Sequence, residues 1–386
     1  MSSLAASATP LRIAVVGVST TAVCGVRDHA TLLTRGLAGA GEQPTMLWLD
    51  YEPAGLAGGR RALGAWVEGL PGELERSGAQ AILLHYSVFG LSHRGVPVFV
   101  HPLLARLKGT GLPLVTIVHE AVYPWNIGGA RGKLWAFTQR VALIELVRRS
   151  SGLLVTASFR EQWLAGRRWL PRRPIETAPV FSNLPAPGPG ARDARSGQRI
   201  GVFGYAYEGA GVALVLDALA AIRRRLGGTE LVLLGAPGAD SPAGREWRRR
   251  AEQQGLAAAV HFSGTLTAAQ LTDALAACDV LLSINSGGPS SRKGSLAGSL
   301  GSGAPVVALD GPHSWRELAE SDAIRVVPSD PRALAEAVLE LLEDPAAAQA
   351  LGERGRAFAE QRMSVSETVR AVEDLLERSG AGSRPR

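Results

Sequence analysis

Short, largely apolar runs alternate with helix-like segments along most of this sequence, and this alternation constrains the fold more than any other feature. Ile13–Val18, Ala81–His85 and Leu112–His119 are three such runs. Continuous apolar runs separated by helices are typical of parallel strands that helices cover on both faces. The sequence therefore predicts an α/β fold.

The alternation stops in a segment rich in Pro and Gly and then restarts, which predicts two domains in the 386 residues. We expect two tandem Rossmann-like, doubly wound domains with an interdomain cleft. Ligands of such sheets bind at the carboxyl ends of the strands, so the cleft is the expected site. The predicted division is an N-terminal domain at 1–184, a linker at 185–198, a second domain at 199–362, and a C-terminal helix and tail at 363–386.

Charge and composition exclude several classes of protein. The net charge is +6, but much of the excess is arginine in short runs such as 223–225 and 248–250, as on solvated helix faces. Aromatic residues do not interleave with these runs, so no nucleic-acid partner is expected. There is no apolar run of 18 residues and no basic leader before Leu11. We expect a cytoplasmic protein, with peripheral membrane contact left open.

Familiar cofactor and metal motifs are absent from the sequence. It contains no GxGxxG, GxSxG, DxD, CxxC or HExxH motif, and Gly128–Lys133 has the wrong spacing for a P-loop. The two cysteines, Cys24 and Cys278, lie far apart, as in a reduced protein. No cofactor and no metal ion is therefore expected.

One segment has an unusual composition for a helix between two buried strands. Residues 290–304 are rich in Gly and Ser, and between Val280 and Leu309 the only charged residues are Arg292 and Lys293. A helix N-terminus with unpaired N–H groups and adjacent basic side chains is suited to bind phosphate. We expect Ser290 or Ser291 to cap this helix. The alternative is an ordinary helix whose glycines allow close packing on the sheet.

Several motifs, in order, resemble the GT-B glycosyltransferases of group 1, also called family 4, which retain the anomeric configuration. The resemblance covers about residues 11–376. It implies a sugar transferred from a nucleotide-diphosphate donor to an acceptor without a metal ion, with the donor bound by the second domain. The motifs are Cys24–His29, Val118–Pro124, Pro179–Pro185, Val202–Gly204, Val260–Gly264 and Gly303–Ala308.

The sequence departs from the family at four usual donor contacts. Tyr205 and Ala210 stand where the family has Arg and Lys, and Ser290 and Gly298 stand where it has two glutamates. A subgroup has a Ser-x-Arg-x-x-Ser type of loop instead, which 290–295 resembles. We expect Arg292 and Lys293 to compensate. The donor-binding residues implied are Gly25, Gly204, Tyr205, Gly264, Ser290, Ser291, Arg292, Lys293, Gly294 and Ser295.

The first domain supplies the other candidates. In the resembling family a His at the position of His119 contacts the transferring sugar, and Glu120 is expected to orient it or to bind acceptor hydroxyls. His85 and Trp125 are expected on the acceptor side. A His that bonds a neighbouring loop, and a Trp that simply packs, are the structural alternatives. Trp169 lies among arginines that can attract an anionic acceptor such as a phospholipid head group.

Two other functions stay open from the sequence. One is a sugar-nucleotide epimerase of the same architecture, although no obvious set of acidic residues is available for proton abstraction. The other is a non-catalytic, glycosyltransferase-like subunit that binds a partner, because four usual donor contacts are missing. The sugar, the base, the acceptor and the oligomeric state are not specified by the motifs.

Overall fold

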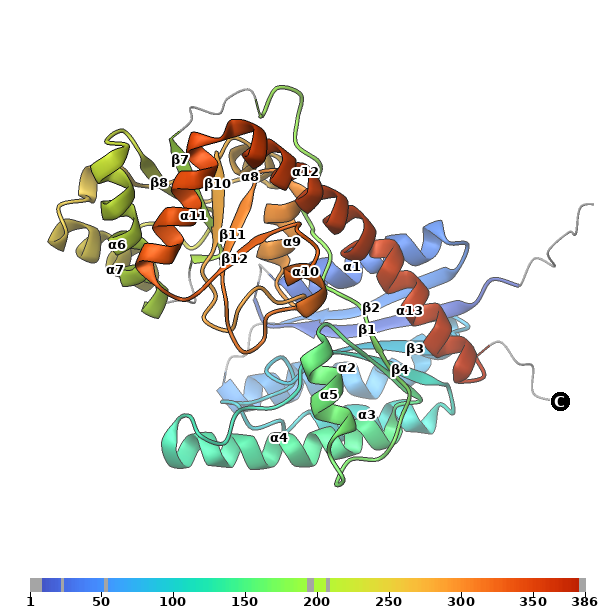
Figure 1. The fold of residues 1–386 in the computed structure, drawn as a ribbon. Coiled ribbons are helices and arrows are strands. Elements are labelled where there is room, and N and C mark those ends of the chain that lie inside the picture. The colour runs from blue at the N-terminus through green and yellow to red at the C-terminus, as the bar shows by residue number, and fades with distance from the viewer. Residues whose placement is uncertain (1–8, 22–23, 52–54, 193–197, 206–208, 382–386) are drawn as a thin grey trace, which may run out of the picture. The chain divides into compact units, whose positions relative to one another are not determined.

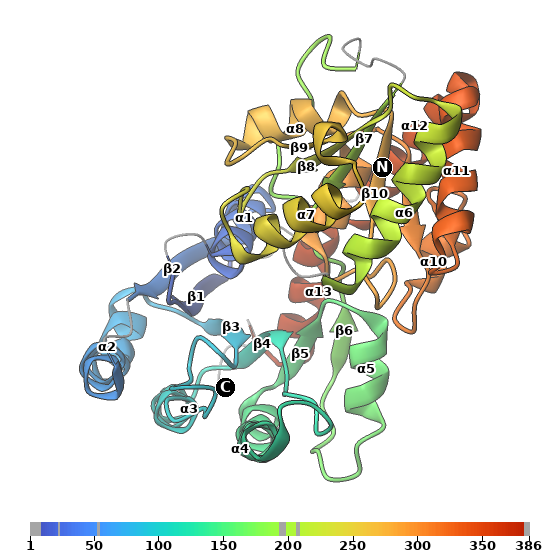
Figure 2. The ribbon, with the colours of Figure 1, turned by 90° about the vertical axis from the view of Figure 1, so that its left-hand side faces the viewer.

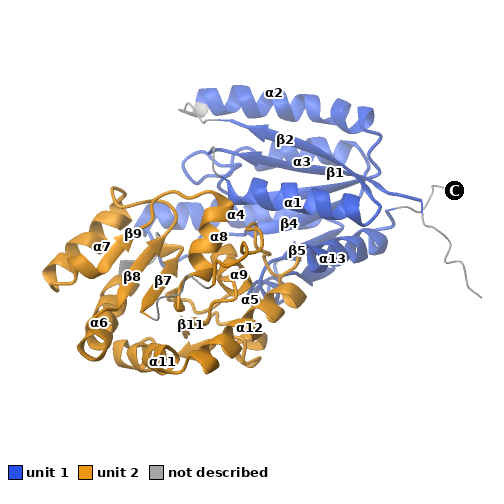
Figure 3. Ribbon diagram, turned by 90° about the horizontal axis from the view of Figure 1, so that it is seen from above, with its two compact units in different colours: residues 1–178, 365–386 blue, residues 179–364 orange. Residues whose placement is uncertain are grey.

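The computed structural model describes residues 9–21, 24–51, 55–192, 198–205 and 209–381. The chain forms two compact units, coloured separately in Figure 3. Unit 1 consists of residues 1–178 and 365–386, and unit 2 consists of residues 179–364. Each unit is a parallel sheet between layers of helices, as Figure 1 shows for both. The predicted fold class of two tandem Rossmann-like domains is confirmed.

The sheet of unit 1 has six parallel strands in the order β2-β1-β3-β4-β5-β6. The central strands are buried along nearly their whole length because both faces are covered. Their bounds are Arg12–Ser19 (β1), Gln43–Asp50 (β2), Ala81–Ser87 (β3), Leu114–Glu120 (β4), Gly152–Val155 (β5) and Ile175–Thr177 (β6).

The helices of unit 1 cover the two faces of its sheet. Figure 2 shows α2, α3 and α4 in a row on one face, with α1 and α13 on the other. The helix bounds are Gly25–Gly39 (α1), Gly55–Arg76 (α2), Val100–Gly109 (α3), Gly129–Arg149 (α4), Ser158–Ala165 (α5) and Val365–Arg378 (α13).

The last helix, α13, completes unit 1 although it follows unit 2 in sequence. Leu375 lies over Gly152, where an added Cβ would be 2.8 Å from its side chain, and Val365 lies over Gly36 at 2.5 Å. Arg378 pairs with Glu176. The two glycines leave room for α13 to lie directly against β5 and α1.

The sheet of unit 2 also has six parallel strands, in the order β12-β11-β10-β7-β8-β9. Leu281 and Leu282, neighbours on β10, belong to different apolar cores, so helices cover both faces of this sheet. The strand bounds are Arg199–Phe203 (β7), Glu230–Leu234 (β8), Val260–Phe262 (β9), Val280–Ser283 (β10), Val306–Leu309 (β11) and Arg325–Val327 (β12).

The helices of unit 2 begin at local signals in several cases. Thr267 and Gln270 form a capping box, and Ser241, Asp330 and Asp344 each accept a bond from a first-turn N–H, followed directly by proline. The helix bounds are Gly209–Arg225 (α6), Pro242–Gln253 (α7), Ala268–Ala276 (α8), Gly294–Gly301 (α9), Arg316–Ala319 (α10), Pro331–Glu343 (α11) and Pro345–Arg362 (α12), and Ala257–Ala259 is a 3-10 turn.

The described part of the expected linker packs on unit 2. The N–H of Gly188 donates to Asp273 at 2.7 Å, and Arg192 donates to the carbonyl of Ser302 at 3.3 Å. Earlier in the chain, the N–H of Val180 donates to the carbonyl of Ser291 at 2.7 Å. The chain therefore joins unit 2 at residue 179, before the Pro/Gly-rich segment, whose residues 193–197 lie outside the described residues.

Candidate functional site

In each sheet the strand order identifies one switch point, where the connections to the next strands leave toward opposite sides of the sheet. In unit 1 the chain runs from β1 to β2 on one side and then to β3 on the other side of β1. In unit 2 it runs from β7 to β8 and β9, and then β10 pairs with the other side of β7. Ligands of doubly wound sheets bind beyond the carboxyl ends of the strands at these points.

Three histidines gather at the switch point of unit 1. His85 lies near the end of β3, His119 near the end of β4, and His29 in the second turn of α1. Nδ1 of His85 and Nε2 of His119 are 3.1 Å apart and hydrogen-bonded, and the two rings are stacked. The ring of His29 stands edge-on to both, with centroids 5.2 Å from that of His119. The structure therefore brings the predicted catalytic His119 and acceptor-side His85 into direct contact.

These histidines are held in their neutral form. Burial lowers the pKa of His29 to about 4. Burial, with the neighbouring imidazoles, lowers the pKa of His85 well below its usual value, and His119 is lowered likewise by burial, His29 and Arg160. A neutral imidazole offers one N–H and one lone pair but no charge. Nδ1 of His119 is the ring nitrogen that His85 does not engage.

Neighbouring polar groups hold the end of β4 in place. Arg160 of α5 donates to the carbonyl oxygen of His119, and Glu120 accepts a bond from Ser87 Oγ at 2.9 Å. Glu120 is exposed. His85 is buried, and within the described residues the Nε2 atom of His85 has no hydrogen-bond partner. Sequence reasoning assigned no role to His29, Ser87 or Arg160. His29 could have been found from its place one turn into the helix that follows β1.

The two remaining candidates of unit 1 are exposed. Gly25 is the first residue of α1, and a Cβ there would meet nothing within 4 Å, so a ligand can approach the backbone closely. Trp125 is 47% exposed, and the guanidinium of Arg140 lies over its ring at 4.5 Å from the centroid. Their roles as donor-binding and acceptor-side residues stay predictions.

The stability of the protein should fall as the pH is lowered from about 6.5 to 4. Native His29 takes up its proton near pH 4 and an unfolded histidine near 6.5, so the unfolded state binds more protons in this window. His29 alone should cost about 3 kcal/mol of unfolding free energy by pH 4.

Chemical denaturation at a series of pH values measures this loss of stability, and His29→Asn should flatten the dependence of the unfolding free energy on pH. His261→Asn, at a side chain that is 46% exposed, is the matched control. Equal curves for the wild type and His29→Asn would contradict the prediction.

In unit 2 the segment after β10 meets the end of β7 at the switch point. Gly204, directly after β7, has φ +84°, and a Cβ on it would lie 2.9 Å from Ser295 Oγ. Ser295 lies in the first turn of α9, whose N-cap is Lys293 and which no side chain caps. The prediction that Ser290 or Ser291 caps this helix is therefore wrong. The first N–H groups of α9, left without intrahelical partners, lie beside the end of β7.

The residues before α9 form a buried turn with an exposed basic tip. Ser290 and Ser291 are each 3% exposed, and the carbonyl of Ser291 accepts the bond from Val180. Within the described residues, Ser290 Oγ is buried and has no hydrogen-bond partner, which is costly unless a ligand supplies one. Arg292 is exposed and Lys293 half-buried. Gly294 has room for a Cβ, with Val180 at 3.8 Å.

Two predicted donor-binding residues, Tyr205 and Gly264, differ in their surroundings, because Tyr205 is buried and Gly264 has open space around it. Tyr205 is 1% exposed, its hydroxyl donates to the carbonyl of Gly235 at 3.3 Å and accepts from the N–H of Gly238 at 2.8 Å, and its ring packs against Phe262. Tyr205 therefore connects the end of β7 to the loop after β8, and a role in donor binding stays a prediction. Gly264 follows β9 with φ +69° and open space around it.

Gly298 occupies the position of the second family glutamate, and its surroundings explain the absence of that residue. A Cβ on Gly298 would lie 3.0 Å from Leu184 and 3.3 Å from Phe203. The segment that enters unit 2 therefore fills the space that a larger side chain would need. The expectation that glycines of this helix allow close packing therefore holds at Gly298. The turn at 290–291 that precedes the helix is buried as well.

Gly298→Glu should destabilise unit 2 by about 3 kcal/mol or more, because it overpacks the core and buries a charge. Thermal unfolding of the purified protein measures this. Gly301→Glu lies on the same helix, and a Cβ there meets nothing within 4 Å, so it is a matched control that should shift unfolding little. A normal melting temperature for Gly298→Glu would show that α9 can move away from Leu184 and Phe203.

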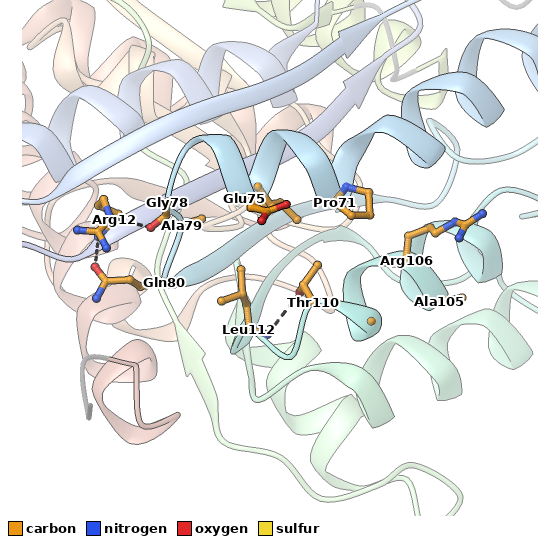
Figure 4. A pocket seen from close by; sticks show the side chains of 12 residues that line it. Arg12, Pro71, Glu75, Gly78, Ala79, Gln80, Ala105, Arg106, Thr110 and Leu112 are labelled. Atoms are coloured by element: carbon orange, nitrogen blue, oxygen red, sulfur yellow. Dashed lines mark hydrogen bonds between the residues drawn. The ribbon is translucent and has the colours of Figure 1, made fainter. Parts of the chain in front are cut away.

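A cavity of about 640 Å³ lies elsewhere on unit 1 (Figure 4). Arg12, Gln80 and Leu112 line it together with Thr110 and Arg106. Arg12, Gln80 and Leu112 stand at or just before the starts of β1, β3 and β4, so the cavity opens at the amino ends of the strands. The histidines lie at the opposite, carboxyl edge, where ligands of such sheets bind.

The three histidines are also the described residues whose positions suit a metal ion. Their ligand atoms lie within 4.8 Å of one another. Neutral imidazoles suit zinc, copper or nickel rather than magnesium or calcium. The sequence analysis predicted no metal ion. No helix in the described part of the chain is long and apolar enough to span a membrane.

Comparisons with known proteins agree with the motifs. Residues 197–344 match the family model of glycosyl transferases group 1. No curated protein sequence matches the chain significantly. Among solved structures, the fold is similar to sucrose-phosphate synthase from Thermosynechococcus elongatus, with a TM-score of 0.71 and 18% identity over 97% of this chain and 100% of that one.

Two further structures have the same fold at low identity. A glycosyltransferase from Rickettsia africae has a TM-score of 0.69 and 12% identity over 96% of this chain and 98% of that one. HepE from Anabaena, in complex with UDP and glucose, has a TM-score of 0.67 and 18% identity over 95% and 99% of the two chains. The resemblance to GT-B proteins of group 1 is confirmed by the family match and these folds.

Proposed function

We propose that this protein transfers a sugar from a nucleotide-diphosphate donor to an acceptor, because residues 197–344 match the family model of glycosyl transferases group 1. Unit 2 would hold the diphosphate and unit 1 would contact the transferring sugar. The donor would leave as the nucleoside diphosphate, and the anomeric configuration would be retained, as the family resemblance implies.

The observation that carries this proposal is the uncapped N-terminus of α9 beside Gly204, at the switch point of unit 2. Helix N–H groups and their partial positive charge stabilise a bound phosphate. The buried Ser290 Oγ, with no partner among the described residues, lies in the turn that leads into this helix. It would complete its hydrogen bonding with a ligand oxygen.

The charge of the leaving diphosphate must be balanced by unit 2. The histidines of unit 1 are neutral at pH 7 because burial lowers their pKa values. Arg292 and Lys293 are then the basic side chains at the α9 turn that supply positive charge as the sugar–phosphate bond breaks. Preorganised donors and charges of this kind stabilise the transition state without reorganising.

His119 would position the sugar rather than transfer a proton. Its Nε2 is bonded to His85, which fixes the ring and leaves Nδ1 for a sugar hydroxyl. Glu120, fixed by Ser87, is exposed and is suited to accept bonds from acceptor hydroxyls. Trp125 offers an exposed ring on which a sugar can stack.

A donor panel tests the proposal most directly. Calorimetry with UDP, GDP, ADP and TDP sugars measures binding, and release of the nucleoside diphosphate in the presence of candidate acceptors measures transfer. UDP sugars come first because HepE, which shares the fold, was crystallised with UDP and glucose. We expect one base to bind at micromolar concentration. Failure of every nucleotide to bind would support the partner-binding subunit instead.

The epimerase alternative gives a different product. Incubation with UDP-N-acetylglucosamine alone, followed by separation of the sugars, would reveal an epimer formed without any acceptor. Transfer requires an acceptor and leaves the configuration at C2 unchanged. An epimer in this control would contradict the proposed transfer reaction.

Metal-independent transfer predicts that chelation has little effect. Protein treated with EDTA and then desalted should keep its rate of donor turnover, because the diphosphate is neutralised by α9, Arg292 and Lys293 rather than by a divalent ion. The rate before and after treatment measures this. A loss that Zn²⁺ restores in the wild type and not in His29→Ala would assign the missing metal to the three histidines.

A further inference from the structure

Helix α4 of unit 1 has two apolar faces, although only one of them packs on the unit. Ala136, Leu143 and Val147 are buried on the inner face. On the outer face Leu134 is 52% exposed, Phe137 59% and Val141 41%. These three residues are three and four positions apart, so they form one stripe along the helix. A surface helix normally presents polar residues there.

The stripe continues into the loop that precedes α4. Trp125 is 47% and Ile127 52% exposed, which makes five large apolar side chains exposed within 17 residues. Across the described part of the chain, the exposed large apolar side chains all lie between residues 89 and 169, and none lies in unit 2. A clustered apolar patch on one unit marks an interaction surface rather than ordinary scatter.

The charges beside the stripe are mostly basic. The exception is Glu145, one turn beyond Val141 on the same helix, and its carboxylate pairs with His101 and Arg149. From Ala121 to Ile144 the sequence has no acidic residue, while Arg131, Lys133 and Arg140 are basic. Helical spacing places Lys133 and Arg140 along one edge of the stripe and Arg131 along the other. Burial, together with the charge of Arg167, lowers the pKa of Arg140. An apolar stripe with basic edges complements an apolar surface covered by negative charge.

We propose that α4 and the loop before it dock on the surface of an anionic phospholipid bilayer. The apolar stripe would enter the boundary between head groups and acyl chains, and the arginines and Lys133 would contact the phosphates. Trp125 suits this depth because indole rings favour the membrane interface. Figure 2 shows α4 in the outer helix row of unit 1, so the stripe can be covered without unfolding any element. This surface is independent of the proposed donor chemistry, and it shares only Trp125 with the proposed acceptor contacts.

Vesicle sedimentation with the full chain tests the proposal. We expect binding to vesicles of phosphatidylglycerol and phosphatidylcholine at equal parts to be at least tenfold stronger than to phosphatidylcholine alone, and to weaken as salt is raised. The double variant Leu134→Ser with Phe137→Ser should lose binding at least tenfold at an unchanged melting temperature. Phe137→Leu, which keeps the apolar surface, should retain it.

A matched pair of charge variants separates local from overall charge. Arg131→Gln with Lys133→Gln should remove the preference for anionic vesicles. Arg316→Gln with Arg332→Gln makes the same change of charge in unit 2, at side chains that are 88% and 87% exposed, and should leave binding unchanged. Equal losses in both pairs, or no vesicle binding by the wild type, would overturn the proposal. So would self-association that the serine variant abolishes, since it would make the stripe a protein interface.

Discussion

Replacing His119 by alanine should lower the rate of sugar transfer by about 10²–10³-fold, as expected for the loss of one preorganised contact to the reacting sugar. The affinity for the nucleoside diphosphate should change little, because the diphosphate is assigned to unit 2. Initial rates at saturating donor, together with calorimetry for the free nucleotide, separate the two quantities. Unchanged turnover would remove His119 from the proposed site.

Controls distinguish a contact to the sugar from a structural role. His119 is hydrogen-bonded to His85, so its removal could also disturb the local packing. His119→Asn keeps a hydrogen-bonding side chain and should recover part of the rate at a normal melting temperature. His85→Asn should act on His119 by altering its position, with a smaller loss of rate and no effect on nucleotide affinity.

Replacing Arg292 by alanine should weaken the binding of the nucleoside diphosphate about 10- to 100-fold. A charge-assisted hydrogen bond contributes about 1.5–3 kcal/mol, and Tyr205 and Ala210 stand where the resembling family has its usual basic donor contacts. Titration calorimetry at two salt concentrations measures the affinity, and the difference between wild type and variant should shrink at high salt. Unchanged donor affinity would leave α9 as a purely structural helix.

Two further variants make the Arg292 result specific. Arg292→Lys keeps the charge and loses the planar fork, so an intermediate affinity is expected. Arg316→Ala removes an arginine of the same unit whose side chain is 88% exposed, and it should leave donor binding unchanged. Together they distinguish a direct contact from the overall charge of unit 2.

The succession of strands along the chain and most long helices could be predicted from the sequence alone, whereas the order of the strands within each sheet was not predicted. Buried parallel strands need continuous apolar runs, and Ile13–Val18 and Val280–Ile284 are such runs. The helices at 55–76, 100–109 and 158–165 were not predicted. Pro71 lies within the first of them and Pro102 in the second, and proline normally indicates a helix end rather than its interior.

The candidate site was likewise predicted only in part from the sequence. The segment at 290–295 was identified from its composition, because a Gly/Ser-rich helix between buried strands with two basic residues is unusual in any fold. Its true N-cap at Lys293 depended on the turn that Val180 forms with Ser291, a contact between residues more than 100 positions apart. The reason for glycine at 298 likewise became visible only with Leu184 and Phe203 in place.

By itself, the sequence determined the fold class, the repeat of two doubly wound units and the basic, glycine-rich start of α9, because periodicity and composition are local properties. Only the tertiary structure decided that His29 joins His85 and His119, and that burial keeps all three neutral. It also decided that Leu134, Phe137 and Val141 face outward. Desolvation and exposure depend on what packs around a side chain, and that information is spread over the whole chain.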